Sequence, residues 1–254
     1  MFNKTERNLI WELTLSDFKL KYNRSVLGFF WSFLKPLLML GVLYLVFHTL
    51  LNFGTPNYEF FLLLGIVLWN FFTESTSNSM QNFVDKKSLI KNVYFPRTIL
   101  VVSSCLNAFM SLLLNIGVFL VILFFAGLFV SWPIIILPLL LIEVYILSLG
   151  FSFALSSLHV KYRDVLNIWE VLLLVGFWIS PIIYPVSFVP QQYLSYYMLN
   201  PMARIINDAR NVVIFHQELP SFLHMGITLF VCLAVLAIGY LIFKRKSPKF
   251  AEEI

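Results

Sequence analysis

The chain has 254 residues, of which 59% are hydrophobic and only 12% are charged. Its mean hydropathy of +0.84 and its low charge exclude a soluble globular domain, in which roughly a quarter of the residues are charged. The composition therefore predicts an integral membrane protein, and the net charge of +5 has to be explained within that class.

Charged residues recur throughout positions 1–32, so this region lacks the uninterrupted apolar core of a signal peptide. We expect it to form a helix with two apolar stripes separated by charge. The stripes are Trp11, Leu15, Phe18 and Tyr22, and Leu9, Leu13 and Leu20. This pattern is typical of a helix at the membrane surface with a second surface behind it.

Six segments are apolar over about 20 residues, the length that a membrane-spanning helix requires. They are 33–53, 60–80, 98–127, 133–158, 166–186 and 220–243. The sequence thus predicts a single all-α domain over 1–254 with six transmembrane helices.

The distribution of basic residues predicts the orientation of these helices. All but two of the 18 Lys and Arg would lie on the face that carries both termini, and the two exceptions are Arg204 and Arg210. Such a bias places the N- and C-termini in the cytoplasm. It also explains the high pI through anionic membrane lipid, so we expect no nucleic-acid partner.

A long polar interruption between spans covers 82–97 and would lie on the cytoplasmic face. Residues 84–92 are predicted to form a short basic helix within it. Asp85 suits the positive end of the helix dipole, and Pro96 stops the helix. A helix held between two spans on this face offers a surface on which a cytoplasmic partner could push.

On the other face, the segment 181–221 is interrupted by Pro181, Pro185, Pro190 and Pro201. Neither part is long enough to span, so two short helices over 187–219 that dip into the membrane and return fit best. This segment would form an outer gate. The candidates for contact with sugars at this gate are Tyr184, Tyr193, Tyr196, Tyr197, Arg204 and Arg210.

The sequence offers no catalytic or nucleotide-binding chemistry of its own. It contains no GxxxxGK[ST] loop, no Ser/His/Asp arrangement in a plausible setting and no Cys/His cluster for a metal. We therefore expect no enzyme activity and no metal site, and any active transport would draw its energy from a partner. Glu74 and Glu143 lie within spans, and we expect them to be satisfied by Asn, Ser or Thr neighbours rather than to form a proton or substrate site.

Residues 21–40 resemble the start of the first span in permease subunits of ATP-binding-cassette exporters of the ABC-2 type. The resemblance is to the branch that exports O-antigen, capsule and teichoic acid polymers, and it extends over nearly the whole chain. The matching residues are Lys21, Arg24, Val26-Leu27-Gly28, Trp31, Pro36, Leu89-Ile90-Lys91, Phe95-Pro96-Arg97, Ser180-Pro181, Tyr184-Pro185, Pro190, Asn200-Pro201 and Arg210.

The resemblance implies a homodimer completed by two copies of a separate ATPase subunit, which would bind ATP and Mg²⁺. The short basic helix would be the coupling helix seated on that ATPase. Its contact residues would be Asp85, Lys86, Lys87, Leu89, Ile90 and Lys91. The cargo would be a glycan on a polyprenyl pyrophosphate lipid, exported across a bacterial inner membrane.

Two groups of residues near the first span are candidates for contact with such a cargo. Lys21, Arg24 and Lys35 supply cations for a pyrophosphate, for which Arg is well suited. Phe30 and Trp31 at the inner mouth of a pore would offer ring faces to sugars. The alternative for the cations is that they only satisfy the positive-inside bias.

Three other functions fit parts of the pattern. The first is an ABC-2 permease for drugs or small lipids, which the short loops disfavour. The second is a stand-alone channel or proton-driven carrier, which would transport without ATP. The third is a membrane scaffold without cargo.

Overall fold

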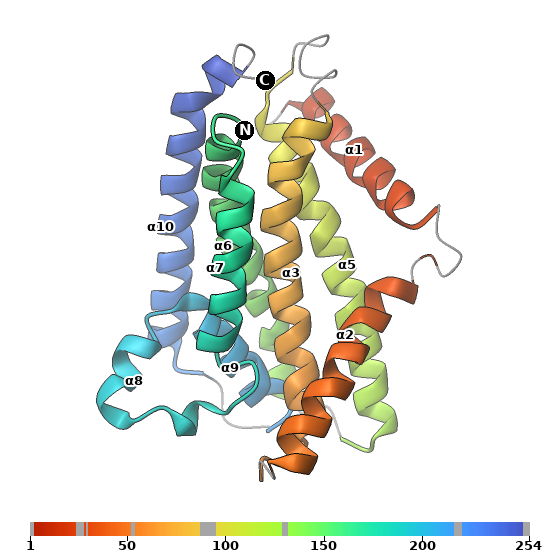
Figure 1. Cartoon of the computed structure of the whole chain (residues 1–254), viewed down its shortest axis with the longest axis vertical. Helices are drawn as coiled ribbons and strands as arrows, with labels where there is room; N and C mark the ends of the chain where they lie inside the picture. The colour runs from red at the N-terminus through yellow and green to blue at the C-terminus, as the bar shows by residue number, and fades with distance from the viewer. Residues whose placement is uncertain are drawn as a thin grey trace.

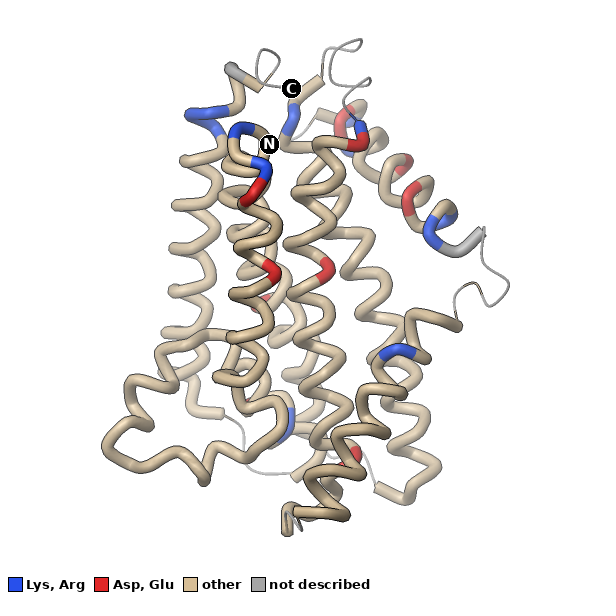
Figure 2. Tube along the Cα trace, viewed as in Figure 1, with Lys and Arg blue, Asp and Glu red and all other residues tan. Residues whose placement is uncertain are grey.

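The computed structural model describes residues 3–23, 28, 30–51, 54–86, 95–128, 132–215 and 220–250, and every regular element within these ranges is a helix. Long helices run side by side as a bundle, and α1 (Lys4–Asn23) leans against one end of it (Figure 1). α1 begins and α10 ends at this same end, where the charged residues gather (Figure 2). The described part of the chain is thus a helical bundle with a charged end and an apolar body.

Among the described residues, five helical segments are long and apolar enough to cross a membrane. They are α2 (Phe30–Tyr44) with its π-helical extension η1 (Leu45–Leu50), α3 (Tyr58–Asp85), α5 (Thr98–Phe125), η2 (Trp132–Ile136) continued by α6 (Leu137–His159), and α10 (Phe222–Lys246). They correspond to five of the six predicted spans, with ends that differ by a few residues.

The remaining predicted span, 166–186, corresponds to α7 (Val165–Ile179), which is apolar but has only 15 residues. At 1.5 Å per residue such a helix is about 22 Å long, less than the roughly 30 Å of a hydrocarbon core. The helix stops before Pro181, and the backbone of Ser180 is extended, with ψ at 151°. A residue before proline favours this conformation, which is why the apolar run continues beyond the helix.

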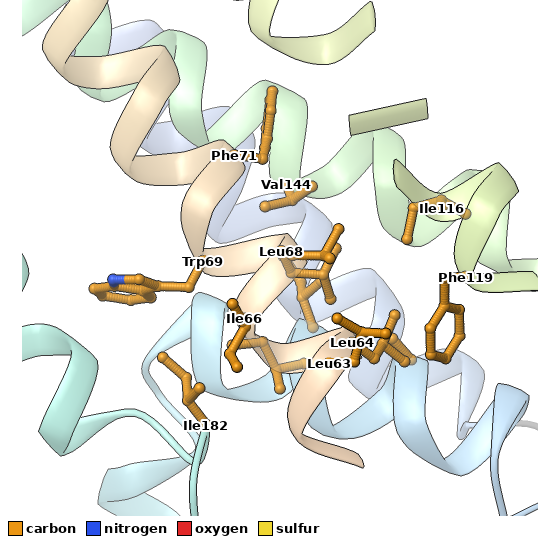
Figure 3. Packing of buried hydrophobic residues seen from close by; sticks show 14 of the residues in the cluster. Leu63, Leu64, Ile66, Leu68, Trp69, Phe71, Ile116, Phe119, Val144 and Ile182 are labelled. Carbon is orange, nitrogen blue, oxygen red and sulfur yellow. The ribbon is translucent and has the colours of Figure 1, made fainter. Parts of the chain in front are cut away.

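The central helix is α3, which packs against α2, α5, α6, α7 and α9. In its most apolar stretch, 78% of the residues are buried. Figure 3 shows Leu64 and Leu68 of α3 facing Phe119 of α5 and Val144 of α6. A helix that is apolar all round is expected to be buried, and here the neighbouring helices bury it.

α6 and α10 approach closely where Gly150 faces Gly239. A Cβ added to Gly239 would lie 2.9 Å from the carbonyl carbon of Gly150, and one added to Gly150 would lie 2.7 Å from the backbone nitrogen of Leu236. Small residues are common where helices associate in membranes because they allow such an approach. At this crossing only glycine fits on either helix without a backbone shift.

An aromatic cluster joins the charged ends of α3 and α10. The rings of Phe83, Phe243 and Phe250 have centroids 5.4 to 5.9 Å apart, and the Arg97 guanidinium lies 5.7 Å from the centre of the Phe250 ring. Phe250 follows the short helix η4 (Ser247–Lys249). The cluster therefore fixes the end of α3, the start of α5 and the end of α10 against one another.

Two short helices, α8 (Gln191–Tyr197) and α9 (Pro201–Val213), lie in the range 187–219, after the turn η3 (Val186–Phe188). α9 begins where the Asn200 side chain accepts a hydrogen bond from the backbone of Met202, with Pro201 in the first turn. This is a standard start for a helix. The apolar face of α9 is buried against α6, α3 and α10.

Candidate functional site

A groove with a volume of about 1110 Å³ lies along α3 and is bordered by α2, α5 and α7. Its lining residues include polar side chains from all of these helices and a set of aromatic rings. The aromatic residues are Trp31, Trp69, Phe71, Phe177 and Trp178. A groove of this volume is larger than most small-molecule sites require, since those measure roughly 300 to 1,000 Å³.

Polar side chains form a track along the groove. Asn70, Thr73, Glu74 and Asn78 of α3 line it, and their spacing of three, four and eight residues places them on one helix face. From α5, Ser111 and Asn115 face the same groove. The buried Oγ1 of Thr73 and Oδ1 of Asn115 have no hydrogen-bond partner among the described residues. Hydrogen-bonding capacity is therefore available along the groove.

A smaller cavity of about 230 Å³ continues the track toward the charged end of the bundle. It shares Lys21 and Asn78 with the groove, and its other lining residues are Asp17, Leu20, Gln81, Asn82, Asp85, Ser104 and Asn107. From Asn70 to Asp85 the track follows α3 for about 22 Å, at 1.5 Å per residue. The two cavities together form one polar path along the central helix.

Ion pairs hold α1 against this path. Lys21 Nζ lies 2.5 Å from Glu74 Oε1 and 3.2 Å from Ser111 Oγ, and Lys86 Nζ lies 2.5 Å from Asp17 Oδ2. The packing face of α1 combines Asp17 and Lys21 with the buried Ile10 and Thr14, and it lies between the two predicted apolar stripes. Trp11 and Leu20, one from each stripe, are more than half exposed.

The structure brings three of the candidate cargo-contact residues onto the groove. Lys21, Lys35 and Trp31 all line it, whereas the Phe30 side chain is 58% exposed and does not. Arg24 lies outside the described residues. Glu74 pairs with Lys21 rather than only with the Asn, Ser or Thr neighbours that the sequence predicted.

At the charged end, α3 continues through Asp85. Val84 and Asp85 are therefore the last two residues of α3, and the short helix predicted over 84–92 does not begin at Val84. The physical reason is that the apolar face of α3 extends to Phe83, which the aromatic cluster buries. Lys86 is bonded to Asp17, and Lys87, Leu89, Ile90 and Lys91 lie outside the described residues.

The four candidate tyrosines at the opposite end divide into two pairs. The hydroxyls of Tyr184 and Tyr197 donate to the carbonyl of Ile179, at 2.7 and 2.9 Å, and lie 3.2 Å from each other. They satisfy the carboxyl end of α7, where carbonyls lack helical partners. Burial raises the pKa of Tyr197, and the bond to Tyr184 raises it further. Tyr193 and Tyr196 are exposed.

Arg210 of α9 is buried at 2% exposure. Its guanidinium donates to the carbonyls of Phe61, at 2.9 Å, Pro181 and Ile182, at 2.8 Å, and its Cζ lies 3.4 Å from the centre of the Phe61 ring. A Cβ on Gly65 would clash with this guanidinium. In this structure Arg210 joins α9 to α3 and to the turn after α7, and its burial leaves no access to a glycan. Arg204 is half-buried, with Nη1 3.5 Å from the carbonyl of His224.

Glu143 in α6 is 1% exposed, and its Oε1 has no hydrogen-bond partner among the described residues. The contact to Asn, Ser or Thr that the sequence predicted is thus not found for this oxygen. Sequence reasoning also missed the polar track itself. A signal was present, because Asn70, Thr73, Glu74 and Asn78 recur at helical spacing within a predicted span.

Comparisons with known proteins agree with this architecture. The sequence model of the ABC-2 type transporter family matches residues 8–214. An O-antigen export system permease protein RfbA of Klebsiella pneumoniae is 29% identical over 249 residues, covering 96% of this chain and 94% of the relative. The protein of the same name in Myxococcus xanthus is 26% identical, with 98% and 96% covered, and the polysialic acid transport protein KpsM of Escherichia coli is 22% identical, with 92% of each chain covered.

The matched region extends from α1 to the residue after α9 and so includes α3, the groove and both ion pairs of α1. The relatives are aligned over nearly their full length as well as over that of this chain. The chain belongs to the ABC-2 type transporter family.

Proposed function

We propose that this chain is the permease subunit of an ATP-driven exporter that moves a lipid-linked polysaccharide outward across the bacterial inner membrane. The observation that carries the proposal is the polar and aromatic groove along α3. The names of the relatives, which refer to O-antigen export and polysialic acid transport, support a polysaccharide as cargo. On this proposal the termini are cytoplasmic, and α7 with the turn after it makes the sixth crossing.

The lining of the groove suits a sliding glycan. Amide and hydroxyl side chains exchange hydrogen bonds with sugar hydroxyls, and the faces of Trp31, Trp69 and Trp178 offer apolar contact to sugar rings. Conduction through a pore requires binding that is favourable but distributed over several weak sites. A track without a single deep pocket fulfils that requirement for a polymer.

A second copy of the chain would complete the path. α2 and α7, which border the groove, expose large apolar side chains such as Leu38, Val42, Val171 and Leu174. Lipid-facing residues and a partner helix would both account for these side chains. A pore in the membrane needs polar walls on all sides, however, and one groove supplies a single wall. We therefore propose a homodimer with the two grooves facing each other.

The cations at the inner part of the groove suit the lipid carrier. Lys21 and Lys35 line the same cavity, and Arg24 lies between them in sequence. Charge-assisted hydrogen bonds from Lys and Arg to phosphate oxygens are among the strong ones in proteins. We propose that these residues contact the pyrophosphate of a polyprenyl-linked glycan as it enters from the cytoplasmic leaflet.

Coupling to ATP is proposed to occur through the segment after α3. Its two ends are held by described contacts, Lys86 to Asp17 and Arg97 to the ring of Phe250. Force applied between these anchors would reach α3, α5 and α1 together. Two copies of an ATPase subunit, which bind ATP and Mg²⁺, would supply that force.

Reversing the charge of Lys91 tests this coupling. We expect Lys91→Glu to reduce polysaccharide export and either to release the ATPase subunit or to leave ATP hydrolysis without export, because the change lies in the proposed contact surface. Co-purification, ATP hydrolysis and surface glycan are measured together. Lys244→Glu is the matched control, since Lys244 is exposed in the last turn of α10. Equal behaviour of the two variants would contradict a contact at Lys91.

A further inference from the structure

Lys21 and Glu74 form an ion pair across the polar path. Lys21 lies in the last turn of α1, and Glu74 lies near the middle of α3. Their charged atoms are 2.5 Å apart, and Ser111 Oγ of α5 lies 3.2 Å from the same Nζ. The pair therefore links three helices at the point where the small cavity meets the groove.

The pair is accessible from the groove. The side chains of Lys21 and Glu74 are 32% and 29% exposed, and both line the cavity. Ion pairs with this degree of exposure contribute little to stability. A stronger anion that reaches Lys21 from the groove can thus displace Glu74 at small cost.

The charged side chains that line the groove sum to zero net charge. Its lining holds Lys21 and Lys35 as cations and Glu74 and Glu170 as acids. An anionic ligand would therefore compete with these acids for the two lysines. Of the two acids, Glu74 is the one that contacts a lysine among the described residues.

We infer that Glu74 occupies the place of an anionic ligand on Lys21, and that a phosphate-bearing lipid headgroup replaces it when it enters the groove. The inference rests on the proposed function and adds a positioning role for Glu74. While the groove is empty of cargo, Glu74 holds Lys21 and the end of α1 against α3 and α5. When the headgroup binds Lys21, the contact between α1 and α3 through Glu74 is broken.

This exchange connects cargo binding to a movement of α1. Asp17, one turn before Lys21, remains bonded to Lys86 at the end of α3. Thr14 and Asn107 also hold α1 to α5, with 3.4 Å between Asn107 Nδ2 and the carbonyl of Thr14. Loss of the Glu74 contact thus frees the last turn of α1 while its middle stays attached. Lys86 marks the start of the proposed coupling segment, so α1 contacts both that segment and the groove.

Binding of farnesyl diphosphate tests the inference. The protein is purified in lipid nanodiscs with its co-expressed ATPase, and binding is measured by calorimetry. We expect Glu74→Gln to tighten binding about fivefold, the equivalent of a surface ion pair of about 1 kcal/mol. The substitution keeps the shape of the side chain and removes the competing charge. Lys21→Gln should weaken binding by a similar factor.

Two comparisons separate displacement from simple repulsion. Glu170→Gln removes an acid from the same groove, and we expect it to change binding less than Glu74→Gln does. In the Lys21→Gln background, Glu74→Gln should have no further effect, because the pair no longer exists. Equal effects of the two glutamine variants, or an effect of Glu74→Gln that persists without Lys21, would overturn the inference.

The remaining arms identify the ligand and control for folding. Inorganic diphosphate should bind more weakly than farnesyl diphosphate, and equal binding would overturn the assignment to a lipid headgroup. Should Glu74→Gln lower the yield of folded complex, Glu74→Asp is the second variant, because it keeps the charge. It should tighten binding less than Glu74→Gln does. A larger effect on binding would contradict displacement. If none of the Glu74 and Lys21 variants changes binding while export stays intact, only the role of Glu74 is excluded. Intact binding without polysaccharide export removes the proposed function.

Discussion

Replacing Arg210 by alanine will lower the stability of the protein more than any other single alanine substitution in α9. The substitution leaves three buried carbonyls, those of Phe61, Pro181 and Ile182, without their donor. Removing one side of a buried, charged hydrogen-bond network costs about 3 kcal/mol or more. For a chain of this size the melting temperature should fall by roughly 10 °C, measured by thermal unfolding of the purified complex in detergent.

The control for this prediction is Arg204→Ala, six residues earlier on α9. Arg204 is half-buried and makes a long contact to the carbonyl of His224, so its loss should shift the melting temperature little. Arg210→Lys should fall between the two, because an ammonium cannot span three acceptors as a planar guanidinium does. A melting temperature for Arg210→Ala equal to that for Arg204→Ala would contradict the structural role assigned to Arg210.

Filling the groove with a bulky side chain will stop export while the complex stays assembled. Asn115 lines the groove from α5, and Asn115→Trp would place an indole in the polar track. Selectivity and passage through a pore depend on its diameter, so we expect export to fall by about tenfold or more. The quantities to measure are surface polysaccharide, the amount of complex in the membrane and its ATP hydrolysis.

Leu114→Trp provides a matched control for the groove. Leu114 is the preceding residue, is 42% exposed and does not line the groove. The same side chain at this position should leave export nearly unchanged, because it adds apolar surface outside the track. If Leu114→Trp blocks export as strongly as Asn115→Trp, or if Asn115→Trp exports normally, the groove is not the path.

The sequence predicted the long helices well for a physical reason. A lipid bilayer demands about 20 consecutive apolar residues, and this requirement is visible without any knowledge of packing. α5 begins at the predicted residue 98, and the segment formed by η2 and α6 begins one residue before the predicted 133. α7 shows the limit of that argument: the apolar run continues through Ile182 and Ile183, which are buried in a turn rather than in a helix.

The site was harder to predict because it depends on which residues meet. The two apolar stripes of α1 concealed the polar residues of its packing face. Lys21 pairs with Glu74, 53 residues away, and Asp17 pairs with Lys86, 69 residues away. Arg210 was predicted to be a contact residue of the outer gate, although its carbonyl partners come from two other segments of the chain. Backbone carbonyls leave no mark in a sequence, so only the structure reveals such partners.

The most direct test of the account is ATP-driven transfer of a lipid-linked polysaccharide in vesicles. The chain is reconstituted with its ATPase subunit in sealed, inside-out vesicles, and labelled glycan that reaches the lumen is measured with and without ATP. We expect transfer that requires ATP and both subunits. Transfer by this chain alone, or without ATP, would contradict it and would indicate a channel or a carrier driven by an ion gradient.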